Sequence, residues 1–273
     1  MGQRVFVFKL AIFMVFFANS DLWAKETSWS YEGHTGPSYW GQLSEDYKMC
    51  QYGVNQSPIE ILDTTLDRLF SLGFIYKDVP LQIARRNNTI EVDYGSPLND
   101  SAHEIEISGE KLTLPALNIH DSTLNISGET YRLKKIQFHA PSEHSYELKT
   151  YPMEVQLHHE DEHQQIAILS IFFTLGEDNS LIAKLWENLP IDTRFVSNPN
   201  VTINAKALLP KQHGYYHYRG SLTTPPCTEG VRWFVFKEAK TLSQAQLDQF
   251  KKHIKPNNRP RQAKNYRFLL ESL

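Results

Sequence analysis

Residues 166–173 read Ile-Ala-Ile-Leu-Ser-Ile-Phe-Phe, with one serine as the only polar side chain. A short run that is apolar at both odd and even positions is typical of a strand buried on both faces. A buried helix is usually longer than this, and the run is rich in β-branched and aromatic residues. We therefore predict that these residues form a central strand of a sheet.

The sequence around this run has the alternation of half-buried antiparallel strands. Between residues 74 and 175, apolar and polar residues recur with a period of two, and Gly, Asn, Asp and Pro separate the runs. This pattern predicts a meander of strands. Further strands are predicted at residues 89–94, 103–108, 123–128, 136–140 and 154–159.

Helical spacing is found in two stretches, residues 179–189 and residues 243–250. Each has apolar residues three or four positions apart behind a side chain that can cap a helix. Residues 25–60 are instead rich in Trp, Tyr, Gly and Pro without periodicity, which indicates an irregular arm packed on the domain. No break in composition divides residues 25–273. We expect a single domain of the α+β class, mainly β, with a few short peripheral helices.

The N-terminal residues differ in composition from the rest of the chain. Basic residues lie beside an apolar run at residues 10–18, which is shorter than the roughly 20 residues that a membrane span needs. This pattern predicts a signal peptide, residues 1–24, cleaved after Ala24, and an exported protein that is periplasmic or secreted. Cleavage near Ser20 is one alternative, and an uncleaved anchor is another. No membrane span is expected after cleavage.

The composition is that of a globular protein, with 41% hydrophobic and 22% charged residues in a chain of 273. The formal net charge is -3 at pH 7. The chain has no excess of positive charge, so we expect neither nucleic acid nor an anionic membrane as a partner. Its two cysteines, Cys50 and Cys227, form either one disulfide, the simpler expectation for an exported chain, or two buried thiols.

Histidine spacing alone gives little support for a metal site. Alternate residues of a strand share a face, so a His-x-His pair would place two imidazoles side by side. The chain has His139, His144, His158 and His159 among its histidines, but it has no such pair. A metal site therefore needs other support.

Five longer strings give that support. They are Gln-Ser-Pro-Ile at 56–59, Phe-His-Ala-Pro-Ser-Glu-His at 138–144, Tyr-Pro-Met-Glu at 151–154, Ser-Leu-Thr-Thr-Pro-Pro-Cys-Thr-Glu-Gly-Val at 221–231 with Trp233, and Asn-Arg-Pro at 258–260. In this order they resemble the bacterial, exported branch of the α-carbonic anhydrases over essentially the whole mature chain. The resemblance implies a large, mostly antiparallel central sheet, a zinc cofactor, and the reversible hydration of carbon dioxide to bicarbonate at a zinc-bound hydroxide.

The resemblance assigns three positions to zinc ligands, which are histidines in the family. Counted without a gap from the Pro-Ser-Glu at 141–143, His139 is at the second ligand position and Gln137 at the first. Counted from Pro152 in the same way, Gln156 is at the third position. Glutamine thus replaces two ligand histidines, and flanking matches fix the register on both sides.

The resemblance also gives roles to other residues. Thr223 matches the threonine that orients the zinc-bound hydroxide, Glu143 matches its glutamate partner, and Glu154 matches the carboxylate that holds the third ligand. Leu222, Ile168 and Trp233 match the apolar wall of the carbon dioxide pocket. Asn88 occupies the position of the family's proton-shuttling histidine. Cys50 and Cys227 match the family's disulfide pair.

His158 is expected to point into the same cavity as Gln156, because alternate residues of a strand share a face. The family has a small apolar residue of the carbon dioxide pocket there. One possibility is a reorganised metal site of His158 and His139, completed by Gln137, Gln156 or Glu154. The alternative is that His158 fills the vacated space and hydrogen-bonds to the glutamines.

Three further expectations concern the surroundings. The amide of Gln156 is expected to donate a hydrogen bond to Glu154, so that this carboxylate stays paired. His159 is expected on the opposite face, in a solvated turn with Glu160, Asp161 and His163. Residues 93–122 are longer than the corresponding family segment and form either an extended hairpin, which their alternation favours, or a binding element.

An amide oxygen is a poor ligand for zinc, which prefers imidazole or thiolate. We therefore expect low zinc occupancy and absent or strongly impaired hydration. Three hypotheses remain: a metal-poor binding module, an active carbonate dehydratase (a lyase) with a metal site reorganised around His139 and His158, and a non-catalytic interaction domain. Carbon dioxide and bicarbonate are partners only if the site is active. The bacterial relatives suggest a homodimer, and no protein partner is indicated.

Overall fold

The computed structural model describes residues 28–273 except 87, 95–102, 108–109, 115–120 and 191–194. The predicted signal peptide, residues 1–24, lies outside the described residues and stays a prediction. Within the described part of the chain, no helix is long and apolar enough to cross a membrane.

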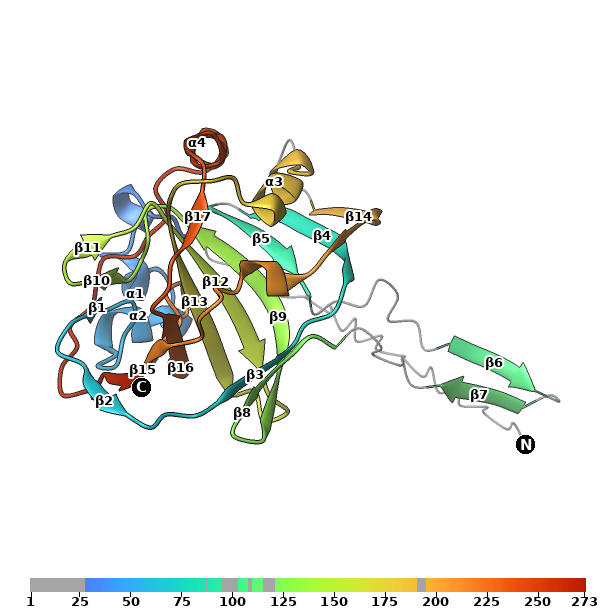
Figure 1. The fold of residues 1–273 in the computed structure, drawn as a ribbon, viewed down its shortest axis with the longest axis horizontal. Helices are drawn as coiled ribbons and strands as arrows, with labels where there is room; N and C mark the ends of the chain where they lie inside the picture. Colours follow the sequence, from blue (N-terminus) through green and yellow to red (C-terminus); the bar gives the residue numbers. More distant parts are fainter. Residues whose placement is uncertain (1–27, 87, 95–102, 108–109, 115–120, 191–194) are drawn as a thin grey trace, which may run out of the picture.

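A large mixed sheet of 13 strands forms the centre of the molecule (Figure 1). The main path of this sheet is, in spatial order, β14 (Phe195–Ile203), β4 (Val79–Arg86), β5 (Thr89–Asp93), β9 (Glu129–His139), β12 (Met153–Glu160), β13 (Ile166–Leu175), β16 (Glu229–Phe236), β15 (Tyr215–Ser221), β18 (Leu270–Ser272) and β2 (Thr65–Asp67). The strands off this path are β3 (Leu72–Ile75), β8 (Thr123–Ile126) and β17 (Lys240–Leu242). Pairs are antiparallel except β13 with β16, β13 with β17, and β18 with β2.

The strand predicted from the apolar run at 166–173 is confirmed as β13, which lies between β12 and β16 and is buried over most of its length. The other predicted strands are confirmed as β5, β8, β9, β12 and β6 (His103–Ile107). However, β9 begins at Glu129, earlier than predicted. The first half of the strand alternates exposed polar with buried side chains, and this alternation breaks at Lys134 and Lys135.

Two smaller sheets accompany the large one. The first contains β1 (Glu60–Ile61), β10 (Ser145–Tyr146) and β11 (Lys149–Thr150). The second is the antiparallel pair of β6 and β7 (Glu110–Leu114), which pairs with no other described strand and lies apart from the large sheet in Figure 1. The stretch 93–122 therefore contains the hairpin that its alternation predicted.

The two predicted helices are confirmed together with their caps. Helix α3 (Ser180–Glu187) is capped by the side chain of Asn179, and α4 (Gln244–His253) by a capping box of Ser243 and Gln246. The N-terminal arm, predicted as irregular, contains single helical turns. These are η1 (Gly33–Thr35), α1 (Trp40–Leu43), η2 (Glu45–Tyr47) and α2 (Met49–Tyr52), and η3 (Ala205–Leu208) lies later in the chain. Such turns are too short to show a helical period.

The two faces of β12 differ, and this difference positions the site. Met153, Val155 and Leu157 lie in the larger apolar core, which also contains Trp186 of α3 and Phe250 of α4. The alternate side chains of β12 are polar and point to the opposite face, as the two-residue period of a strand requires. Polar residues are thus held in a row by a strand whose other face is fixed in the core.

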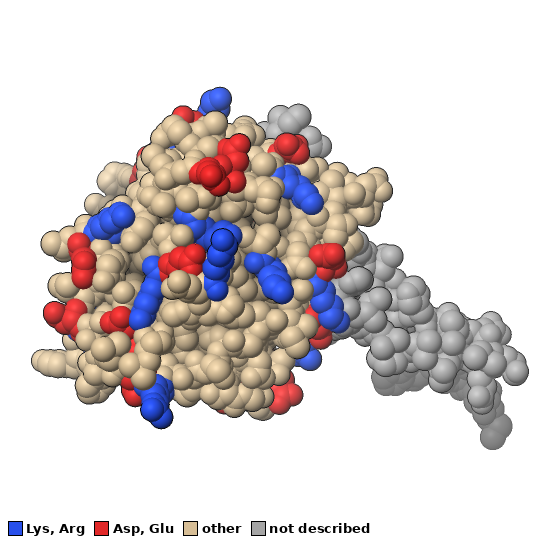
Figure 2. Space-filling model, in the orientation of Figure 1, with Lys and Arg blue, Asp and Glu red and all other residues tan. Residues whose placement is uncertain are grey.

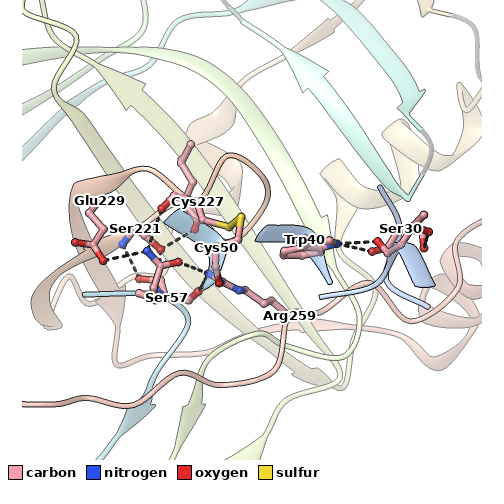
Figure 3. Close-up of a disulfide and its surroundings, with 11 residues drawn as sticks. Ser30, Trp40, Cys50, Ser57, Ser221, Cys227, Glu229 and Arg259 are labelled. Carbon is pink, nitrogen blue, oxygen red and sulfur yellow. Dashed lines mark hydrogen bonds between the residues drawn. A yellow bond between two sulfur atoms is a disulfide. The ribbon is translucent and has the colours of Figure 1, made fainter. Parts of the chain in front are cut away.

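The predicted disulfide is present between Cys50 of α2 and Cys227, with a Cα–Cα distance of 5.0 Å (Figure 3). The alternative of two free thiols is wrong. The bond closes a sequence separation of 177 residues, for which the loop-entropy model gives a stabilisation of about 5 kcal/mol. It ties the N-terminal arm to the loop that contains Thr223.

Charged side chains of both signs are interspersed over the face shown in Figure 2, without a continuous patch of one sign. This distribution agrees with the formal net charge of -3. On this face the protein has no field that would attract a polyanion.

Candidate functional site

The candidate site lies where β9 and β12 pair side by side. In the antiparallel register, His139 is opposite Glu154, Gln137 opposite Gln156, and Lys135 opposite His158. These side chains lie on one face of the sheet and form two facing rows. His139, Gln137, Gln156 and His158 therefore lie on one face of two neighbouring strands.

Glu154 is the centre of a buried hydrogen-bond network. Its Oε2 accepts from the backbone N–H groups of Glu143 at 2.9 Å and His144 at 2.8 Å. Its Oε1 bonds to the His144 ring at 2.9 Å, the Ser170 hydroxyl at 2.8 Å and the Gln156 amide at 3.0 Å. Burial by itself raises the pKa of Glu154, but His144 and His139, with these hydrogen bonds, lower it to about 2. The carboxylate is therefore ionised and fully paired.

The amide of Gln156 bridges two carboxylates. Its Nε2 donates to Glu143 at 2.8 Å and to Glu154 at 3.0 Å, which confirms the expected bond to Glu154. Because carboxylates only accept, the NH2 group must be on this side, and Oε1 must point away. Oε1 is buried and has no hydrogen-bond partner among the described residues.

The ring of His139 has one bonded and one bare nitrogen. Its Nδ1 lies 2.8 Å from the carbonyl oxygen of Asn257, so Nδ1 carries the hydrogen and donates it. Nε2 then has a lone pair, is buried, and has no partner among the described residues. This is the tautomer in which a metal-binding histidine offers Nε2.

Gln137 is turned toward a cluster of charges. Its Nε2 donates to Glu91 at 3.0 Å, and the same carboxylate pairs with Lys135 at 3.1 Å and Arg86 at 3.0 Å. No hydrogen bond joins Gln137 to Gln156 in the described part of the chain. The two glutamines thus belong to separate networks, one charged and near the surface, the other fully buried.

His158 is buried, and its Nε2 has no hydrogen-bond partner among the described residues. The expected hydrogen bonds from His158 to the glutamines are therefore not formed. Burial, followed by the nearby Lys135, His139 and His159, lowers the pKa of His158 well below its usual range. The ring is neutral at neutral pH.

His159 corrects a prediction. It faces away from His158, as expected, but it is buried, and its Nε2 lies 2.8 Å from the hydroxyl of Tyr76, whose ring it stacks on. Burial lowers its pKa to about 3. The opposite face of β12 is apolar core rather than a turn, so only the following residues, such as the exposed His163, are solvated.

The remaining predicted residues surround these strands. Ile168 and Trp233 are fully buried, and Leu222 packs against the same apolar cluster. Thr223 is buried. The oxygens of Glu143 accept from Gln156 and from the backbone N–H of Arg259. Asn88, which the resemblance assigns to the shuttle position, donates to the carbonyl oxygen of Trp29 at 3.3 Å.

Comparison with known proteins identifies the family. The sequence model of eukaryotic-type carbonic anhydrases matches residues 35–271. This chain belongs to the α-carbonic anhydrase family. A carbonic anhydrase of Neisseria gonorrhoeae is 36% identical over 246 residues, covering 90% of this chain and 88% of that protein. Dioscorin DB3S of Dioscorea polystachya is 33% identical and covers 91% of this chain and 89% of that protein.

The fold is shared with solved members of the family. The structure of a hyperthermostable carbonic anhydrase from an active hydrothermal vent chimney has a TM-score of 0.79 and 37% identity, covering 90% of this chain and 100% of that one. Both the family and the fold expected from the five strings are therefore confirmed.

The α-carbonic anhydrase family is zinc-dependent, but the residues that the sequence resemblance assigns to the zinc position do not fit the ion. The three positions offer one imidazole nitrogen and two amides, and the amide of Gln137 is bonded to Glu91. In the described part of the chain, no three His, Cys, Asp or Glu side chains form a metal-binding group. Zinc requires three such strong donors in a catalytic site.

No sequence pattern indicates a role for Arg259, which lies in the Asn-Arg-Pro string at 258–260. Its guanidinium donates to Gln56 and the Ser57 carbonyl at 2.8 Å and to the Cys50 carbonyl at 3.0 Å (Figure 3). Burial lowers its pKa to about 10, so it remains a cation, and its backbone holds Glu143. It thus joins the arm, the disulfide and the site.

Proposed function

We propose that this α-carbonic anhydrase family member has lost, or retains only weakly, the zinc-dependent hydration of carbon dioxide, and that its cleft acts as a binding pocket. The observation that carries the proposal is the amide of Gln156 bonded to Glu143 and Glu154 at the third ligand position. In this orientation Gln156 offers a neutral amide oxygen where the family has imidazole.

The chemistry of the donors supports this proposal. Zinc generates a hydroxide at neutral pH by lowering the pKa of its bound water to about 7. Loss of a residue that only positions a metal ligand weakens metal binding or activity about 10- to 100-fold. Here two of the residues at the ligand positions are themselves glutamine instead of histidine. Zinc held by His139 alone would be lost to solvent at ordinary concentrations.

The second support comes from Glu143. By resemblance, this carboxylate pairs with Thr223 to orient the attacking hydroxide. Here its Oε2 accepts from Gln156 and its Oε1 from the backbone of Arg259. The substitution at 156 therefore removes a ligand and also occupies the group that would orient the nucleophile.

The test is stopped-flow hydration of carbon dioxide by the full chain, with zinc added. We expect rates near background for the native protein. The double variant Gln137→His with Gln156→His should bind zinc stoichiometrically and gain activity, and the addition of His158→Val should raise it further by clearing the apolar pocket. Sulfonamide-sensitive turnover of the native protein at ordinary carbonic anhydrase rates would overturn the proposal.

We also propose that the protein acts outside the cytoplasm, in the periplasm or beyond it, after removal of residues 1–24. The disulfide supports this, because such bonds persist in oxidising compartments. Sequencing of the N-terminus of the mature protein is the test. A mature protein that still begins at Met1 would contradict cleavage.

A further inference from the structure

An open pocket of about 490 Å³ lies beside β15, and none of the residues that the resemblance assigns to the zinc position lines it. β15 pairs with β18 only at Tyr216 and His217, so the chain before Leu270 separates from β15 and leaves a space there. The start of β16 and Asn55 of the N-terminal arm complete the walls. A pocket of this size accommodates a small organic molecule.

Arg267 is fixed in this pocket by uncharged groups. Its guanidinium donates to the carbonyl oxygens of Lys264, Arg219 and Ala263 at 2.9, 3.2 and 2.7 Å. Its Cζ also lies 5.5 Å from the centre of the Tyr218 ring. In the described part of the chain it forms no ion pair with a carboxylate. Two of its five N–H groups therefore remain for a ligand, and its positive charge is held in place without a counter-ion.

The charges of the pocket sum to one positive unit. Arg219, exposed on β15, is the second cation and also forms no ion pair with a described carboxylate. Glu229 supplies one negative charge, and its Oε1 accepts from the backbone N–H of Asn55 at 2.6 Å and from Gln56 at 3.0 Å. Burial lowers the pKa of His217 to about 4, so this lining residue is neutral at neutral pH. The pocket therefore suits one negative charge, and a second would meet Glu229.

Apolar side chains are exposed at the rim of the pocket. Phe268 lines it and is 81% exposed. Val54 is 63% exposed, and its carbonyl oxygen accepts from the side chain of Asn265 at 2.6 Å, which holds the arm beside the segment that contains Phe268. Exposed apolar groups around a pocket with convergent polar groups are typical of a ligand site.

We propose that this pocket binds a small aromatic monocarboxylate. Arg219 and Arg267 receive the carboxylate, and the ring of the ligand packs on Phe268. The planar fork of a guanidinium matches a carboxylate in shape as well as in charge. The site goes beyond the proposed function and does not depend on it, because its lining contains none of the residues at the zinc-ligand positions.

The experiment is a titration of the full chain with benzoate at low ionic strength, followed by saturation-transfer NMR. We expect saturable binding with a Kd of about 1 mM or lower. Benzamide has nearly the same shape but no charge, and it should bind at least about fivefold more weakly. Phthalate has a second carboxylate and should also bind more weakly, because Glu229 repels it. Added salt should weaken the binding of benzoate, because it screens exposed charges.

Four variants locate the site. Arg219→Gln should weaken the binding of benzoate at least about fivefold, because it removes one of the two cations, whereas Arg219→Lys should retain part of the affinity. Phe268→Ala should weaken it about 2- to 10-fold through loss of ring packing. These side chains are exposed, and thermal unfolding checks that each variant is folded. Arg132→Gln is the matched control, because this arginine of β9 pairs with Asp121, and it should change nothing.

The inference is overturned if benzoate does not saturate the protein at concentrations up to about 20 mM, or if benzamide binds equally well. An unchanged affinity in folded Arg219→Gln, or an equal loss in Arg132→Gln, would also overturn it. A preference for phthalate would contradict the assignment to a monocarboxylate. None of these results bears on the proposed function, because the hydration of carbon dioxide is measured separately.

Discussion

The two ends of the Gln156 amide lie in contrasting surroundings. On the nitrogen side, Glu154 is surrounded by donors from Glu143, His144 and Ser170, and its oxygens are fully paired. On the oxygen side, the polar atoms of His139 and His158 have no described partner. The network that supports the fold is thus complete without a metal, while the part that would touch a ligand is not. The polar atoms that stabilise the fold are therefore distinct from those that have no partner among the described residues.

The largest loss of stability is expected when the hydrogen-bond network around Glu154 is broken. Glu154→Ala removes the acceptor for two backbone N–H groups, the Ser170 hydroxyl and the Gln156 amide, all buried. The free energy of unfolding should fall by about 3–5 kcal/mol, as for loss of one partner of a buried charged network. Urea unfolding measures this. The exposed Glu162→Ala is the control, and an equal loss in both variants would contradict the comparison.

The next effect concerns pH and the core face of β12. In the folded protein the pKa of His159 is about 3, below its usual value of 6.5. At pH values between these two, the unfolded chain therefore binds more protons than the folded protein. Stability is therefore full above pH 6.5 and falls with pH, by up to about 1.4 kcal/mol per unit. Glu154, with a pKa of about 2, adds to the loss as the pH falls below about 4.5.

Urea unfolding between pH 7 and pH 4 checks this dependence. From pH 6 to pH 4, His159 should account for a loss of roughly 2–3 kcal/mol. His159→Phe should lose less over the same interval, since it has no proton to bind in the unfolded state. An identical slope in both proteins would show that His159 is not responsible.

The smallest change in stability is expected at His158. In chelator, His158→Val removes a buried nitrogen that has no partner among the described residues and puts an apolar side chain in its place. Its free energy of unfolding should rise by about 1 kcal/mol. Differential scanning calorimetry measures the change. Destabilisation instead would indicate that His158 is held by a partner in the metal-free protein.

The sequence predicted what depends on local pattern. Alternation located the strands, and capping residues located both helices. Gapless counts assigned Gln137 and Gln156 to one site, and the structure pairs them across β9 and β12. Hydrogen-bond partners distant in sequence were not predictable. Gln137 bonds to Glu91 across the neighbouring strand, and Arg259 reaches the arm from the far end of the chain. No periodicity relates such pairs.

The error on His159 has a different physical origin. His159 is the last residue of the predicted strand 154–159, and it was grouped in a solvated turn with the polar residues that follow it. The strand in fact continues to Glu160, with an irregularity between His158 and His159, so His159 still faces the core. A neutral imidazole is tolerated there because Tyr76 and the Ala167 carbonyl pair with it.

The position of Asn257 and Arg259 near the C-terminus has a consequence for how the protein matures. His139 and Glu143 depend on these residues for their hydrogen bonds, and Arg259 also holds the arm near Cys50. The hydrogen bonds of His139 and Glu143 inside the cleft therefore form only after residues 257–259 have been synthesised.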